Sequence, residues 1–374
     1  MKRFIFDRLV DRENICDLVR EQELLNRYVE QRAHVVVYAP RNYGKTSIVK
    51  NIISEEFRCR HKRCFVFFAE LIEVRSMNSL EARLRSAFER SFEESFPLRN
   101  LLDNATHFLS SLRPELSIDP LTGGPSLSLG ITEQQSAITI QSLFAHIANI
   151  IREIPGLIVL DEFQDIAHIP EASGTMRAAF EEIDAAPVIL MGSRQHLLSD
   201  LFAKPEAPLA AWGTDLEFSS IPYNEYHKYI AERFEQNSLG LSLENATYLQ
   251  DLMQRVPEAV NRLCQQILDL NTGKEIEKSD IAVALRELLK NRESRYETYL
   301  AQFSHTEERV LIAVAKSSGV RKPQSKTFLA RVNLTSRSVG QIFKRLMDRS
   351  ILEKNINSYR ISDPLLAAYL QYYR

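Results

Sequence analysis

Short apolar runs alternate with longer amphipathic stretches over roughly the first 221 residues of the chain. Runs rich in β-branched and aromatic side chains are typical of strands that are buried on both faces. They predict strands at 35–38, 64–69, 157–160, 187–194 and 216–221. The stretches around them predict helices, within the first 30 residues, from about residue 47, and at 79–96 and 134–152. Strands that alternate with helices predict an α/β fold with a parallel sheet.

The pattern changes at Pro222, after which apolar positions recur mainly at helical spacing. This spacing predicts a helical lid with helices at 223–235, 243–255, 258–270 and 278–291. Beyond it, helices are expected at 294–303, 305–317, 324–331 and 335–348, then a hairpin at 351–361 and a last helix at 364–372. Helices followed by a two-stranded wing are typical of a winged helix-turn-helix domain. The expected domains are an α/β core at 1–221, a lid at 222–291 and a winged helix at 292–374.

One segment of the core departs from the alternation of strands and helices. Residues 116–130 have apolar positions at a period of two on either side of a turn that contains proline and glycine. This pattern predicts a β-hairpin. An exposed surface hairpin is the simpler interpretation, because the pattern itself carries no chemistry, and a hairpin that grips a ligand is the alternative.

Composition sets bounds on size and environment. A chain of 374 residues is long enough for two or three domains. Its net charge of −2 gives no sign of a nucleic-acid partner, so local charge has to be examined instead. The four cysteines lack the spacing of metal ligands, and reduced thiols are expected. The sequence has neither a signal-peptide pattern nor an apolar run long enough to span a bilayer, which predicts a cytoplasmic protein without a membrane partner.

A phosphate-binding motif follows the first strand. Residues 39–47 read Ala-Pro-Arg-Asn-Tyr-Gly-Lys-Thr-Ser, the G-x-x-x-x-G-K-[ST] pattern with Ala39 in place of the first glycine. Gly44 would let backbone N–H groups approach a phosphate, Lys45 would reach its oxygens, and Thr46 would place its hydroxyl on Mg²⁺. An ordinary strand-to-helix turn is the alternative. The residues expected to contact ATP or ADP are Ala39, Pro40, Arg41, Asn42, Tyr43, Gly44, Lys45, Thr46 and Ser47.

Two adjacent acids follow the strand at 157–160. Ligands of a parallel sheet bind at the carboxyl ends of its strands, so Asp161 is expected to hold Mg²⁺. Glu162 would accept a proton from a water that attacks the γ-phosphate. The alternative is a pair of acids that favours the start of a helix, and the phosphate-binding motif upstream weakens it.

Ser193 and Arg194 end the next strand. An arginine here would sense the γ-phosphate or help to position the attacking water, because a guanidinium is always charged and can bind two phosphate oxygens. A solvated surface arginine at the start of a helix is the alternative. The catalytic residues predicted from the sequence are therefore Lys45, Glu162 and Arg194.

Together these motifs resemble a known family. The phosphate loop, Leu-Asp-Glu-Phe-Gln at 160–164, Gly-Ser at 192–193 and a C-terminal segment that closes on Tyr-Arg-Ile-Ser-Asp-Pro at 359–364 are similar to prokaryotic ATPases of the STAND class, within them the archaeal-type ATPases. These proteins are relatives of AAA+ ATPases. The resemblance covers nearly the whole chain and implies that ATP or ADP binds between core and lid. It also implies hydrolysis that is coupled to a conformational or assembly switch.

The resemblance extends to single segments, with two departures. Residues 18–24 are similar to the family's N-terminal helix, which lies against the nucleotide base. Pro257 matches a lid proline that packs on adenine, and a plain helix start is the alternative. Ala39 replaces the first loop glycine, and residues 210–215 lack the arginine that the family commonly has before the fifth strand. An arginine finger is therefore unassigned, and rapid intrinsic turnover is not implied.

The winged-helix segment is basic. Residues 303–374 hold thirteen lysines and arginines against five acids, in a chain whose net charge is −2. Such a balance favours binding to nucleic acid. A helix with Thr335 as its N-cap would present Arg337, Gln341, Lys344 and Arg345 to the major groove of double-stranded DNA. A protein-docking or autoinhibitory winged helix is the competing interpretation.

The sequence therefore favours an ATPase or molecular switch that binds Mg-ATP and couples its nucleotide state to DNA or to a protein partner. Self-association controlled by the nucleotide would be one form of this coupling. The alternative from another class is a nucleotide-gated scaffold or regulator that does not hydrolyse ATP. Glu162 favours the enzyme, whereas the missing arginine favours the slow switch. A small-molecule kinase is a third possibility, but such an enzyme has little use for a winged helix.

Overall fold

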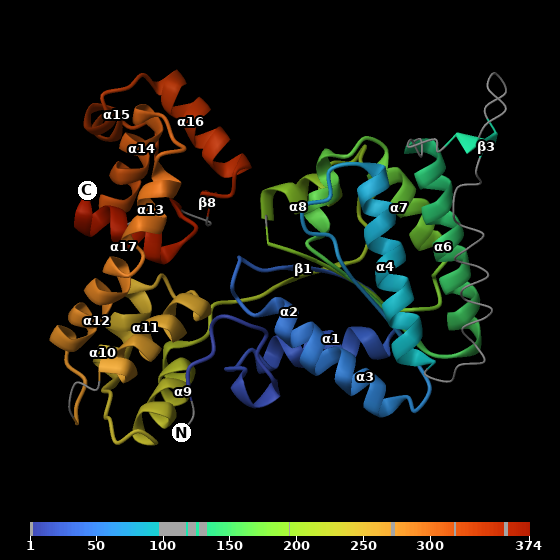
Figure 1. Cartoon of the computed structure of the whole chain (residues 1–374), viewed down its shortest axis with the longest axis horizontal. Helices are drawn as coiled ribbons and strands as arrows, with labels where there is room; N and C mark the ends of the chain where they lie inside the picture. Colours follow the sequence, from blue (N-terminus) through green and yellow to red (C-terminus); the bar gives the residue numbers. More distant parts are fainter. Residues whose placement is uncertain are drawn as a thin grey trace. The chain divides into compact units, whose positions relative to one another are not determined.

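The structure is a computed structural model that describes residues 3–96, 133–193, 195–270, 274–317, 319–354 and 358–374, and a short strand pair at 117–118 and 125–126. The chain folds into two compact units, which Figure 1 colours along the sequence. The first unit comprises Met1–Asp17, Arg41–Gly44 and Ser220–Arg374. The second comprises Leu18–Pro40 and Lys45–Ser219.

The second unit is built on a five-stranded parallel sheet, as the sequence predicts. The strands lie in the order β2-β5-β6-β1-β7. Their bounds are His34–Tyr38 for β1, Phe65–Glu70 for β2, Gly156–Asp161 for β5, Val188–Gly192 for β6 and Thr214–Glu217 for β7. Strand β6 thus lies between β1, which leads into the phosphate loop, and β5, which ends in Asp161. All three carboxyl ends therefore meet at one edge of the sheet.

The edge strand β7 differs from its prediction. The sequence predicts a strand at 216–221, whereas β7 covers Thr214–Glu217. Its bounds follow from β1, which pairs Val35 with Thr214 and Tyr38 with Glu217. Just before the strand, Gly213 has a φ of +75°, and a Cβ at this position would lie 3.2 Å from the carbonyl oxygen of His34. A glycine therefore lets the chain turn tightly into the sheet.

Helices cover the sheet on both faces. On one face, buried aliphatic and aromatic side chains join the strands to α4 (Met77–Ser95), α6 (Glu133–Glu153) and α7 (Ala172–Glu181). In Figure 1, α1 to α3 lie on the other side of the strands. These elements are α1 (Val19–Glu30), α2 (Lys45–Ile48), a π turn (Val49–Ile53) and α3 (Ser54–Arg60). A 3₁₀ helix (Phe163–His168) and α8 (Gln195–Phe202) follow β5 and β6.

The lid helices belong to the first unit. They are α9 (Tyr223–Glu235), α10 (Leu243–Leu252), α11 (Pro257–Leu270) and α12 (Lys278–Lys290). Helix α10 ends three residues before its predicted end. Gln254 and Arg255 have φ values of 51° and 58°, and this left-handed backbone cannot continue a right-handed helix.

A winged-helix arrangement closes the first unit. Its elements are α13 (Glu293–Leu300), α14 (His305–Lys316), α15 (Lys326–Val332), α16 (Ser336–Asp348), the antiparallel strands β8 (Leu352–Lys354) and β9 (Tyr359–Ile361), and α17 (Pro364–Tyr373). Thr335 caps α16 as predicted, because its hydroxyl accepts a hydrogen bond from the N–H of Ser338 at 3.2 Å. The three-domain division at 221 and 291 remains our proposal for this chain.

The hairpin predicted at 116–130 lies largely outside the described residues. The described part pairs β3 (Ser117–Ile118) with β4 (Pro125–Ser126) in antiparallel register. In the part of the chain that the structure describes, every helix is too short or too polar to cross a membrane.

Candidate functional site

The loop after β1 has the backbone conformation that a phosphate cradle needs. Asn42 and Gly44 have left-handed φ values of 64° and 82°. A Cβ on Gly44 would meet no atom within 4 Å, so the backbone angle rather than crowding calls for glycine here. Ala39 and Tyr43 are buried, whereas Arg41 and Asn42 are exposed. The loop therefore exposes its middle residues and leaves space beside the Gly44 backbone.

Four predicted site residues of the second unit form one cluster. The Thr46 hydroxyl donates a hydrogen bond to Asp161 Oδ2 at 2.5 Å. Lys45 Nζ lies 2.7 Å from Glu162 Oε1 and 3.7 Å from Asp161 Oδ1. The side chains of Lys45, Asp161 and Glu162 are 7%, 2% and 12% exposed. The fold thus brings the two sequence motifs into direct contact at the carboxyl edge of the sheet.

Burial and charge oppose one another in their effect on the pKa of both acids of this cluster, and the balance differs between the two. Burial raises the pKa of Asp161, although Lys45 and the hydroxyl of Thr46 oppose the rise. Burial would also raise the pKa of Glu162, but the ammonium of Lys45 and hydrogen bonds from Gln164 and Ser193 lower it to about 2. Glu162 is therefore ionised at neutral pH.

The cluster offers oxygen donors of the kind that Mg²⁺ prefers. Among the described residues, no group of three or more His, Cys, Asp and Glu side chains is arranged to hold a metal ion. Mg²⁺ is usually held through one or two carboxylates, together with phosphate oxygens and water, rather than by an all-protein cage. The adjacent hydroxyl of Thr46 and carboxylate of Asp161 fit this requirement.

Two polar residues outside the predicted catalytic set hold Glu162. Gln164 Nε2 and Ser193 Oγ donate hydrogen bonds to Glu162 Oε2 at 2.6 Å and 2.8 Å. Gln164 is 1% exposed. The sequence signal for Gln164 is its place two residues after Glu162, within the Leu-Asp-Glu-Phe-Gln stretch at 160–164. The sequence signal for Ser193 is its place at the end of a strand, next to Arg194.

Other predicted residues do not join this cluster in the described structure. Arg194 lies outside the described residues. Pro257 is the half-buried first residue of α11 in the first unit, and its carbonyl accepts a hydrogen bond from the Tyr226 hydroxyl at 3.1 Å. Its contact with adenine stays a prediction. Residues 210–215, where an arginine is missing, supply Trp212, which is buried and stacks on His34.

Helix α16 exposes the residues predicted to meet DNA. Its apolar face, comprising Val339, Ile342, Phe343 and Leu346, is buried. The opposite face exposes Arg337, Gln341, Lys344 and Arg345. Arg345 Nε lies 3.1 Å from Glu307 Oε1 of α14, so this guanidinium already has an ion-pair partner. The contact of these four exposed residues with DNA stays a prediction.

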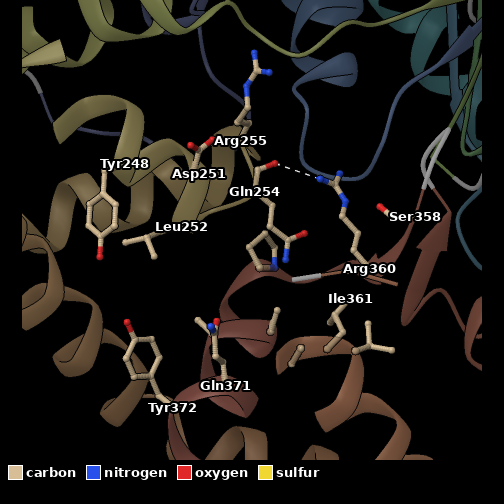
Figure 2. A pocket seen from close by; sticks show the side chains of 16 residues that line it. Tyr248, Asp251, Leu252, Gln254, Arg255, Ser358, Arg360, Ile361, Gln371 and Tyr372 are labelled. Atoms are coloured by element: carbon tan, nitrogen blue, oxygen red, sulfur yellow. Dashed lines mark hydrogen bonds between the residues drawn. The ribbon is translucent and has the colours of Figure 1, made fainter. Parts of the chain in front are cut away.

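A cavity of about 510 Å³ lies elsewhere in the first unit, between α10, β9 and α17. Figure 2 shows Tyr248 and Tyr372 with their hydroxyls pointing toward one another across it. The dashed line in Figure 2 is the hydrogen bond from the Arg360 guanidinium to the carbonyl oxygen of Gln254, at 3.4 Å. The lining includes none of the site residues predicted from the sequence.

The parallel sheet, the phosphate loop and the C-terminal wing together define a P-loop ATPase fold with a winged helix domain. A family model described as "Probable winged helix domain" matches residues 294–372. A search of curated proteins found no match.

Solved structures share this fold over nearly the whole chain. The Walker-type ATPase of Pyrococcus abyssi is 16% identical, with a TM-score of 0.63 over 98% of this chain and 99% of that one. The ORC2 protein of Aeropyrum pernix, in ADPNP-ADP complexes, is 13% identical, with a TM-score of 0.55 over 99% and 97%. The ORC1 protein of Aeropyrum pernix in complex with DNA is 12% identical, with a TM-score of 0.51 over 97% and 94%. At these identities the likeness concerns the fold.

Proposed function

We propose that the chain binds Mg-ATP and hydrolyses it to ADP and phosphate. The observation that carries the proposal is the contact of the loop residues Lys45 and Thr46 with Asp161 and Glu162. The likeness in fold to a Walker-type ATPase and to a protein in ADPNP-ADP complexes supports it.

In this proposal each residue of the cluster has one task. Lys45 neutralises charge on the phosphate oxygens, and the loop backbone donates N–H groups to them. Thr46 and Asp161 hold Mg²⁺, which supplies charge neutralisation at the phosphates when it is bound. Glu162, ionised at neutral pH, accepts the proton of the attacking water.

Two substitutions separate binding from chemistry. Lys45→Ala removes the cation for the phosphates and should abolish ATP binding, measured by isothermal titration with Mg-ATP. Glu162→Gln keeps the shape of the side chain but removes the base, so it should retain ATP and lower turnover at least about 100-fold. If Glu162→Gln hydrolyses ATP at the unmutated rate, the base is assigned to the wrong residue.

We propose further that the nucleotide state controls engagement of double-stranded DNA through the winged helix. The exposed cations on α16 support this step, because phosphate contacts from lysine and arginine dominate DNA affinity. The neighbouring ORC1 protein is in complex with DNA.

The second candidate is a nucleotide-gated scaffold that does not hydrolyse ATP and acts through a protein partner or self-association. One observation favours it: both carboxylate oxygens of Glu162 accept hydrogen bonds within the chain. A base held in this way acts only after one of these partners has been exchanged. Tight ATP or ADP binding without turnover would support the scaffold.

A further inference from the structure

We propose that Gln164 is a positioning residue: it fixes one carboxylate oxygen of Glu162 and leaves the other to take the proton. The inference rests on the proposed ATPase function and refines it. Gln164 is buried and lies two residues after Glu162, and its contacts determine which oxygen of the base stays in place.

The amide of Gln164 is held in one orientation. Its Nε2 donates to Glu162 Oε2 at 2.6 Å and to Asp165 Oδ1 at 2.9 Å. Its Oε1 accepts a hydrogen bond from the backbone N–H of Ser193 at 3.2 Å. A flipped amide would place its oxygen against two carboxylates, so the three bonds are compatible with one orientation.

The neighbouring strand leaves room for this amide. A Cβ on Gly192, the last residue of β6, would lie 2.5 Å from Gln164 Oε1 and 2.9 Å from a methyl carbon of Leu198. Glycine at this position therefore lets the Gln164 side chain approach the β6 backbone. The amide is consequently held close to the last residue of β6, and its oxygen accepts from the backbone of Ser193, the next residue along the chain.

The two oxygens of Glu162 have partners of different kinds. Oε2 accepts from Gln164 Nε2 and from the Ser193 hydroxyl, both neutral donors next to the end of β6. Oε1 accepts from the ammonium of Lys45 at 2.7 Å. A bound phosphate would compete for that ammonium, because the lysine of a phosphate loop also pairs with the phosphate oxygens. Oε1 is thus the oxygen whose partner is exchangeable, and Oε2 is the oxygen that stays fixed.

The test replaces the amide by an apolar side chain of similar size. Gln164→Leu should lower kcat for ATP hydrolysis about 10- to 100-fold, because misplacing a reacting group by about 1 Å costs rate on this scale. The Kd for Mg-ATP should change less than about threefold, since within the described residues the hydrogen bonds of Gln164 go to Glu162, Asp165 and Ser193 and not to Lys45 or Thr46. In the Glu162→Gln background, Gln164→Leu should have no further effect on turnover, because there is no base left to position.

Two further variants separate positioning from folding. Gln250→Leu makes the same change at another buried glutamine, in α10 of the first unit, and should leave kcat within about twofold. Ser193→Ala removes the second donor to Oε2 and should lower kcat in the same way. It takes the place of Gln164→Leu as the test if that variant does not fold. Thermal melting of every variant identifies a loss of folded protein.

The outcomes distinguish this inference from the proposed function. An unchanged kcat in Gln164→Leu or in a folded Ser193→Ala, with Glu162→Gln inactive, overturns the positioning role of the two hydrogen bonds to Oε2 but keeps the ATPase. Equal losses of kcat and ATP affinity, or a further loss in the Glu162→Gln background, assign Gln164 to the structure of the site instead. Binding of ATP by the unmutated chain without any turnover refutes both the base and its positioning by Gln164, whereas the absence of ATP binding refutes the proposed function itself.

Discussion

Glu162 adopts a backbone conformation that few residues with side chains occupy. Its φ is 53°, in the left-handed region that costs a non-glycine residue about 1 kcal/mol or more. The cost is offset locally, because its backbone N–H donates to Asp161 Oδ1 at 2.8 Å. The same turn directs its side chain to Lys45 of the phosphate loop. Backbone strain at this residue therefore accompanies the contact on which the proposed chemistry depends.

A second residue-scale feature is the stack of His34 on Trp212. The rings lie 4.9 Å apart with an interplanar angle of 5°. Burial lowers the pKa of His34 from 6.5, with a partly opposing effect of Asp184. Between the lowered folded value and 6.5, the unfolded chain binds more protons than the folded one at this residue. His34 should therefore make the second unit less stable as the pH falls below about 6.5.

This pH dependence is open to measurement, because Trp212 is the single tryptophan of the sequence and lies in the second unit. His34→Phe keeps an aromatic ring but cannot titrate. The fall in Tm between pH 7.5 and pH 5.5, followed by tryptophan fluorescence, should be smaller in His34→Phe than in the unmutated chain. His305→Gln, in the first unit, is the matched control and should keep the original fall. An equal fall in all three proteins would contradict the assignment.

At the scale of elements, β1, β2, β5 and β6 could be predicted because their side chains are mainly apolar and buried, whereas the bounds of the exposed edge strand β7 could not. Helix α7 could not, because Ser173, Gly174 and Thr175 are poor helix formers. Packing of Met176 and Phe180 into the core forms that helix despite its composition. Tertiary contacts, which a single sequence does not contain, decided this element.

In the candidate site, too, some features could be predicted from the sequence and others depend on tertiary contacts. The residues of the two motifs could be predicted, because each carries its own chemistry at a strand end. The hydrogen bonds from Gln164 and Ser193 to Glu162 could not be predicted, since they depend on β6 lying beside β5. Which strand lies between the motifs is a property of the sheet order rather than of either motif. The sequence therefore predicted the four residues that lie together in the cluster and missed the two side chains that hydrogen-bond to Glu162.

Helix α16 gives an element-scale prediction about DNA. Within the described residues, Arg337 and Lys344 have no ion-pair partner, whereas Arg345 is paired with Glu307 of α14. Arg337→Glu with Lys344→Glu should weaken duplex binding at least about tenfold at low salt, measured by fluorescence anisotropy. Arg345→Gln should weaken it less, because its guanidinium is shared with Glu307.

A charge-matched control excludes a general effect of net charge. Lys228→Glu with Lys290→Glu makes the same change in net charge on exposed residues of the lid and should leave DNA affinity within about twofold. Equal weakening by both double variants would indicate binding through overall charge. Unchanged affinity in Arg337→Glu with Lys344→Glu would remove α16 from the DNA interface.

At the scale of the whole molecule, charge is distributed unevenly. The chain carries a net charge of −2 and residues 303–374 carry +8, so the rest of the chain carries −10. DNA is repelled by a surface of the same sign and attracted by a basic one, so the proposed DNA binding would be directed to the winged helix. Association should therefore be fastest at low ionic strength, where screening is weakest.

The same uneven distribution of charge makes coupling between the Lys45–Glu162 cluster and the winged helix testable through ATP turnover. If DNA engagement and nucleotide state are linked, duplex DNA should raise the rate of ATP hydrolysis at about 50 mM salt, and the increase should fade at about 200 mM as phosphate contacts weaken. Arg337→Glu with Lys344→Glu should lose the stimulation but keep the basal rate, because neither residue lies in the Lys45–Glu162 cluster. Stimulation that survives in this variant would place the DNA contact elsewhere on the chain. If DNA changes the rate of ATP hydrolysis at neither salt concentration and the basal rate is intact, DNA is not coupled to the nucleotide. The nucleotide would then control binding to a protein partner or to a second copy of this chain.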